Sequence, residues 1–204
     1  IKYVNKKSIN KPSPGKKIIQ AFNYGLKHSI NDYDLIGKFD GDIILPDNYL
    51  YTIMNDFIQN KKLGLCSGVI ANKKNNSWKV ENRYNNDHAR GAIKLYSRKC
   101  FNKIGGLNET MGWDTLDEMK ILYNKFEIKI YNKIIVKQMR NTASRYKKNQ
   151  YKKQGRVMYL LRYNLILLLI GSIKIAITSK SIISFYNCII GYINSWVNNE
   201  KYIV

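Results

Sequence analysis

The sequence predicts an α/β fold in which a mostly parallel sheet is flanked by helices and followed by a helical tail. Over residues 1–145, short apolar runs alternate with segments of helical periodicity, which is typical of a sheet covered on both faces. A basic stretch follows, and residues 157–204 are apolar with helical spacing. We therefore expect an α/β domain over 1–145, a basic junction over 146–156 and an apolar or amphipathic helical tail over 157–204.

The composition excludes several classes of protein. Of the 204 residues, 45% are hydrophobic and 12% are aromatic, so the chain can bury a core and is not intrinsically disordered. Cys66, Cys100 and Cys188 lie far apart, which argues against a zinc site or a disulfide framework. The formal net charge is +21. Part of this charge is explained by a general bias of the composition towards Lys, Asn, Ile and Tyr, which places extra lysines on solvated faces. The rest is consistent with an anionic partner.

Hydrophobic spacing predicts the elements of the domain in order. Apolar side chains recur at intervals of three and four over 16–29 and 47–60, so two helices are expected there. In the second helix, the residues expected to face the core are Leu50, Ile53, Met54 and Phe57. Strands are expected at 33–39, 63–70, 91–97 and 128–136, a helical turn at 101–104 and a further helix near 115–125.

Asp40 and Asp42 form the most informative motif. They follow the expected strand 33–39 in the run Lys38-Phe39-Asp40-Gly41-Asp42. Ligands of open α/β sheets bind outside the carboxyl ends of the strands. Two carboxylates at that place are able to hold Mg²⁺ or Mn²⁺, with a substrate diphosphate completing the coordination. The alternative is a turn that merely ends the strand.

Four segments together resemble the family-2 glycosyltransferases, which have the GT-A fold and bind nucleotide-diphosphate sugars. In order, they are Pro14-Gly15-Lys16-Lys17 with Ala21-Phe22-Asn23-Tyr24-Gly25; Phe39-Asp40-Gly41-Asp42-Ile43; Arg90-Gly91-Ala92 with Tyr96-Ser97-Arg98 and Ile104-Gly105-Gly106-Leu107; and Gly112-Trp113-Asp114-Thr115-Leu116-Asp117-Glu118. The resemblance implies metal-dependent, inverting transfer of a sugar from a nucleotide-diphosphate sugar to a hydroxyl group. The acceptor would be a glycan or a lipid-linked molecule in polysaccharide or glycoconjugate synthesis.

The resemblance also implies which residues bind the donor. Asp40 and Asp42 would bind the metal, Mn²⁺ or Mg²⁺, together with the donor phosphates. Lys38 and Arg140 are expected to be further cofactor-binding residues. Gln138 stands where many relatives have a metal-binding histidine, so Arg140 would compensate by holding the diphosphate as a fixed cation.

The catalytic base is expected among Asp117, Asp114 and Glu118. We favour Asp117, because it opens the expected helix and the helix dipole would help to keep it ionised. The residues expected to contact the substrate are Arg90, Gly91 and Trp113. For Trp113 a place in the core is an equal alternative, and for Arg90 a surface ion pair. His88 is expected to be solvated in a polar loop.

The position of Asp40 bears on the extent of the domain. The resemblance implies that a complete GT-A domain would have a further strand, helix and strand ahead of this motif. We therefore expect residues 1–145 to be a partial GT-A domain, truncated at the N-terminus and with little activity alone.

The tail contains two uncharged stretches, 163–173 and 181–197. Because a spanning helix needs about 20 apolar residues, we expect a helical pair that lies on a membrane surface. Packing on the domain and a true span are the alternatives. The expected location is cytoplasmic and peripheral, on the inner face of the plasma membrane.

Two other functions are consistent with the residues. A catalytically degenerate GT-A scaffold would explain Gln138. A basic polyanion-binding module would explain the basic and aromatic residues of the tract 145–153, although no known nucleic-acid-binding module surrounds it and no specific nucleic acid is expected.

Overall fold

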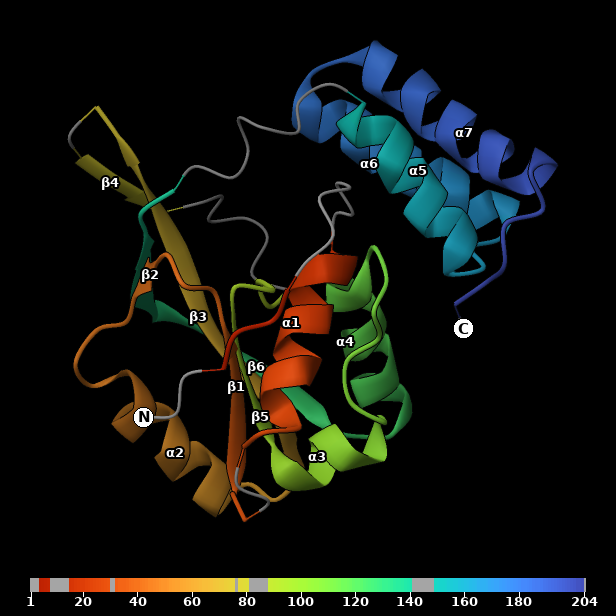
Figure 1. Ribbon diagram of the computed structural model, residues 1–204. Helices are drawn as coiled ribbons and strands as arrows, with labels where there is room; N and C mark the ends of the chain where they lie inside the picture. The colour runs from red at the N-terminus through yellow and green to blue at the C-terminus, as the bar shows by residue number, and fades with distance from the viewer. Residues whose placement is uncertain are drawn as a thin grey trace. The chain divides into compact units, whose positions relative to one another are not determined.

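The computed structural model of the chain describes residues 4–7, 15–29, 32–75, 77–80, 88–140 and 149–203 (Figure 1). The chain divides into two compact units, Ile1–Asn141 and Thr142–Val204. Pro14, the middle of the loop before Arg90 and the start of the expected basic junction at 146–148 lie outside the described residues.

The first unit is built around one sheet. Its strands are β1 (Leu35–Phe39), β2 (Ile43–Ile44), β3 (Leu63–Lys74), β4 (Ser77–Val80), β5 (Ile93–Ser97) and β6 (Glu127–Gln138). The strand order is β1-β5-β3-β6-β2, and β4 pairs with β3. Among the described strands only β3 and β6 pair in parallel, and the other pairs are antiparallel. The expectation of a mostly parallel sheet is therefore wrong.

The insertion of β5 explains this difference. β1, β3 and β6 run in the same direction, as the alternation of strands and helices indicates. However, β5 enters between β1 and β3 in the opposite direction, so these two strands do not pair. The short strands β2 and β4, which the sequence did not predict, add two further antiparallel pairs.

Helices cover both faces of this sheet, as expected. They are α1 (Lys16–Leu26), α2 (Tyr49–Gln59), α3 (Arg98–Lys103) and α4 (Trp113–Tyr123). One core cluster joins α1, α3 and α4 to the sheet, and the other joins α2 to the opposite face (Figure 1). Neighbouring strand residues alternate between the two clusters: Leu65 and Tyr96 face α4, whereas Cys66 and Leu95 face α2.

The inward face of α2 differs from the expected one. Tyr49, Ile53 and Phe57 are buried, whereas Leu50 and Met54 are 47% and 46% exposed. The Tyr49 hydroxyl donates a hydrogen bond to the Ile93 carbonyl oxygen at 3.2 Å. The expectation is therefore right for Ile53 and Phe57, whereas Tyr49 is buried in place of Leu50 and Met54.

The described residues of the second unit form three helices, α5 (Gln150–Leu160), α6 (Leu165–Ser179) and α7 (Ile182–Val197). α7 contacts both α5 and α6. A Cβ atom on Gly155 would lie 1.8 Å from the Cys188 carbonyl oxygen, and one on Gly191 would lie 2.0 Å from the Lys152 carbonyl oxygen. The backbones of α5 and α7 therefore meet directly. Within the described parts of the chain, every helix is too short or too polar to cross a membrane.

Candidate functional site

The residues expected to be functional gather at the carboxyl end of β1. The main-chain N–H of Asp40 donates to the Ala92 carbonyl oxygen at 3.0 Å, just before β5. The N–H of Met139 donates to the Asp42 carbonyl oxygen at 2.8 Å, just after β6. The Asp-Gly-Asp turn therefore lies between the start of β5 and the end of β6. These bonds bring it beside the segments that contain Arg90 and Arg140, both of which are exposed.

Two buried lysines face each other across the first two strands of the sheet. Lys38 in β1 is directly opposite Lys94 in β5, and they are 3% and 0% exposed. Their ammonium groups lie 5.1 Å and 5.4 Å from the centre of the Trp113 ring. Like charges in this position destabilise a sheet, so each lysine needs a nearby anion. Lys38 pairs with the carboxylate of Asp40.

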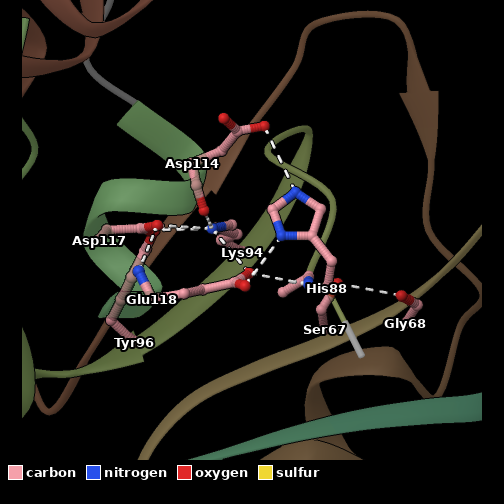
Figure 2. A network of polar contacts seen from close by, with 9 residues as sticks. Ser67, Gly68, His88, Lys94, Tyr96, Asp114, Asp117 and Glu118 are labelled. Atoms are coloured by element: carbon pink, nitrogen blue, oxygen red, sulfur yellow. Dashed lines mark hydrogen bonds and ion pairs between the residues drawn. The ribbon is translucent and has the colours of Figure 1, made fainter. Parts of the chain in front are cut away.

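Lys94 is held by the first turns of α4 (Figure 2). Its ammonium group donates to both carboxylate oxygens of Asp117, at 2.8 Å and 3.0 Å. It also lies 3.2 Å from Glu118 Oε1 and 2.6 Å from the main-chain oxygen of Asp114. The Tyr96 hydroxyl donates to the same Asp117 carboxylate. The lysine is thus fully enclosed by acceptors.

Asp117 is enclosed as well, because its side chain is only 2% exposed. Burial raises the pKa of this carboxyl group, against the opposing effect of Lys94. Burial and the negative charge of Asp117 also raise the pKa of the Tyr96 hydroxyl, which stays a hydrogen-bond donor. This enclosure argues against Asp117 as the catalytic base. Its carboxylate instead holds Lys94 and Tyr96 in place.

His88 lies between two carboxylates (Figure 2). Its Nδ1 is 2.9 Å from Glu118 Oε2, and its Nε2 is 3.6 Å from Asp114 Oδ2. The hydrogen bonds to Asp114 and Glu118 raise the pKa of His88 to about 9, so the ring is a cation at neutral pH. The expectation that His88 is solvated is therefore wrong. The sequence did not indicate this contact, because Glu118 lies 30 residues further along the chain.

Asp114 has the most accessible carboxylate of the three acids. Its side chain is 36% exposed, against 11% for Glu118, which also accepts a hydrogen bond from the Ala89 N–H at 2.8 Å. Burial acts to raise the pKa of Asp114, but the hydrogen bond with His88 and the charge of Lys94 outweigh it and the pKa is lowered. Asp114 is therefore ionised at neutral pH and open to a ligand.

Trp113 belongs to the core, and it lies so close to Gly91 that a larger residue would not fit at position 91. The residue is 5% exposed, so its ring offers almost no surface to a sugar. A Cβ atom on Gly91 would lie 2.8 Å from Trp113 Cζ2 and 3.3 Å from the Asp114 Cβ. The expectation that Trp113 is a stacking platform is thus not supported. Gly91 instead permits the loop before β5 to pass closely over the ring.

The fold is similar to that of a glycosyltransferase. One similar solved structure is the mannosyltransferase PcManGT from Pyrobaculum calidifontis in complex with GDP-Man and Mn²⁺, with a TM-score of 0.54 and 12% sequence identity. The match covers 87% of this chain and 54% of that protein, so this chain spans about half of its length. No family model and no curated protein matches the sequence. The fold is shared, whereas membership of family 2 stays a prediction.

The donor set of the turn fits a divalent ion that arrives with a diphosphate. Asp40 and Asp42 offer hard oxygen ligands, and the Asp40 side chain is 27% exposed. Among the described residues, no group of three or more His, Cys, Asp or Glu side chains is arranged to hold a metal. Gln138 is 4% exposed and ends β6, where it pairs with Ile43. The oxygens of a bound diphosphate are of the same hard type as these carboxylates.

Lys94 is the main residue that the sequence prediction missed. It is the only charged residue in the run Ala92-Ile93-Lys94-Leu95-Tyr96. A lysine is rarely buried unless it is paired, so its place in the middle of an apolar strand was a usable signal. The signal indicates a buried ion pair, but the partner could not be read from local spacing because Asp117 lies 23 residues away.

The His88 ion pairs predict a dependence of stability on alkaline pH. The pKa of His88 is raised in the folded state, so its stabilising effect is complete below the unfolded value of about 6.5 and is lost as pH rises through about 9. His88→Gln should lower the free energy of unfolding by about 1–2 kcal/mol at pH 6. The effect is no larger because the ring is one-third exposed and solvent partly screens its ion pairs. Urea unfolding at pH 6 and pH 10 tests this, and equal differences between the two proteins at both values would contradict it.

Proposed function

We propose that the chain carries the catalytic centre of a metal-dependent, inverting glycosyltransferase. It would transfer a sugar from a nucleoside-diphosphate sugar to a hydroxyl group of a glycan or lipid-linked acceptor. The main support for the proposal is that the ammonium groups of Lys38 and Lys94 both lie over the Trp113 ring. Through it, the Asp-Gly-Asp turn and the acidic start of α4 are neighbours. The similarity of the fold to that of a mannosyltransferase also supports the proposed sugar transfer.

The donor would bind at the Asp-Gly-Asp turn. Asp40 and Asp42 would hold Mn²⁺ or Mg²⁺, which offsets the charge that develops on the departing nucleoside diphosphate. Lys38 fixes the Asp40 carboxylate from the buried side, so that its remaining oxygen is left for the ligand. Arg140 is exposed just beyond β6 and would supply a fixed cation to the diphosphate.

Asp114 is the proposed base. Its carboxylate would accept the proton of the acceptor hydroxyl while that oxygen forms a bond to the anomeric carbon. On the opposite face of the sugar the bond between the anomeric carbon and the phosphate oxygen breaks, and its electron pair leaves with the nucleoside diphosphate. The configuration at the anomeric carbon is thereby inverted. Protonated His88 would keep Asp114 ionised and oriented.

The donor site is tested with Asp42→Asn. GDP-mannose is the first donor to assay, because the similar solved structure holds it, followed by other nucleotide sugars. Mn²⁺-dependent release of nucleoside diphosphate should fall by about 10²-fold or more, the scale for loss of one preorganised charge contact. Asp47→Asn is the matched control, because Asp47 is exposed and lies five positions beyond the motif.

Several outcomes would contradict the donor site. Full activity in Asp42→Asn would exclude Asp42 as a metal ligand, and activity that survives removal of divalent ions would exclude the metal. A folded chain that is tested with any upstream residues of its natural protein, and still neither binds nor turns over any donor, would favour the degenerate scaffold. Salt-sensitive binding to heparin that is unchanged by Asp42→Asn would then favour the polyanion-binding module.

A further inference from the structure

The second unit places small residues inside and large apolar residues outside. The buried residues of α6 and α7 are Leu168, Ser172, Ser184, Cys188, Gly191 and Ser195. The exposed apolar residues on the same helices are Leu165, Ile166, Leu167, Leu169, Ile170, Ile173, Ile177, Ile182, Ile183, Tyr186, Ile190, Ile193, Trp196 and Val197. A helix pair in water has the opposite distribution, because burial of large apolar side chains drives its packing.

The packing between these helices is also typical of lipid surroundings. Small residues let helices approach closely where the solvent gives no hydrophobic force between them. Gly191 meets α5 so closely that a Cβ atom would lie 2.0 Å from the Lys152 carbonyl oxygen. The Ser184 hydroxyl accepts a hydrogen bond from Ser179 at 2.9 Å, which joins α7 to the end of α6. Close contacts and hydroxyl groups thus hold the unit together, while the branched side chains point away.

The charges around this apolar face are nearly all positive. Residues 149–203 contain seven lysines and arginines and one acidic residue, Glu200. Arg162 precedes α6 and Lys180 follows it, both exposed, so their long side chains are placed to reach headgroups from the ends of the helix. Trp196 is 58% exposed and Tyr186 is 59% exposed. Such aromatic residues favour the boundary between acyl chains and headgroups.

We propose that the exposed faces of α6 and α7 lie in the headgroup–acyl boundary of an anionic lipid bilayer. Each helix is too short or too polar to cross it, so both would lie along the surface with their apolar faces immersed. A soluble monomer rarely exposes an apolar patch of this extent. A second copy of the chain would cover the apolar residues but would bring the same positive charges together, whereas anionic lipid neutralises them. The proposal does not depend on the proposed sugar transfer.

The test is flotation of the whole chain, synthesised in the presence of vesicles. We expect it to float with phosphatidylcholine vesicles that contain phosphatidylglycerol, and less with phosphatidylcholine alone. Ile170→Glu combined with Ile190→Glu should weaken binding by at least about 10²-fold, because two immersed apolar side chains become charged. Ile58→Glu is the matched control, since Ile58 is 63% exposed but lies on α2 of the first unit.

Fluorescence of Trp196 gives a second readout that does not depend on folding of the charged variants. The emission should shift to shorter wavelength when anionic vesicles are added, and Trp196→Phe should remove that shift. A chain that stays in solution as a dimer would show that a second copy covers the face. A monomer that neither floats nor shifts would show that the rest of the chain covers it. Either result overturns the proposal, as would equal flotation of the double variant and the wild type.

Discussion

Lys94→Met is expected to destabilise the first unit by about 3–5 kcal/mol, the largest change of stability that the site predicts. Lys94 is fully buried, and its ammonium group pairs with Asp117 at 2.8 Å. Methionine fills a similar volume but leaves the Asp117 carboxylate, 2% exposed, without its cation. The cost is therefore the uncompensated buried charge rather than a cavity. Urea unfolding at neutral pH, monitored by circular dichroism, measures it.

A matched control and a double variant separate the charge from other effects. Lys103→Met makes the same substitution at an exposed position of α3 and should change the stability by less than about 0.5 kcal/mol. Adding Asp117→Asn to Lys94→Met removes the orphaned charge and should recover part of the loss, because residues in contact are not additive. A loss below about 1 kcal/mol for Lys94→Met, or no recovery in the double variant, would show that the pair is not a buried structural unit.

Local patterns predicted the elements but not the order of the strands. The helix periodicity of 16–29 and 47–60 corresponds to α1 and α2, and the apolar runs correspond to β1, β3, β5 and β6. The position of β5 between β1 and β3 depends on contacts between segments far apart in the sequence. Hydrophobic spacing contains no information on such pairing, so the sheet direction was predicted wrongly. The two-residue strand β2 is too short to give a periodic signal.

The same limit applies to the candidate site. Asp40 and Asp42 are two positions apart, so they are recognisable as a pair from the sequence. The partners of His88 and Lys94 are brought by folding from α4, and no spacing rule connects them. Its position in the helix favoured Asp117 as the base. A base must be accessible to the acceptor, however, and in the structure the Asp114 carboxylate is exposed whereas that of Asp117 is buried. Burial is a property of the whole unit that local patterns do not give.

Asp114→Asn is expected to lower kcat for sugar transfer by about 10²–10⁴-fold, the usual contribution of a general base, with a smaller change in KM. The amide cannot accept the proton of the acceptor hydroxyl. Asp114 lies in the first turn of α4 and its side chain is 36% exposed, so the variant should lose only about 1 kcal/mol of stability. Asp117→Asn is the comparison. It should reduce the fraction of protein that is folded, whereas the kcat of the folded protein should change little.

The pH profile distinguishes the two acids further. A base must be deprotonated, and the pKa of Asp114 is lowered, so kcat should stay constant on the acid side to below the usual range of an aspartate. The pKa of Asp117 is raised by burial, so a base at that position would lose activity at a higher pH. If Asp114→Asn keeps its activity while folded Asp117→Asn has none, Asp117 is the base and must become accessible during the reaction. If the acid limb is low and Asp114→Asn is inactive, the exposed carboxylate beside His88 accepts the proton.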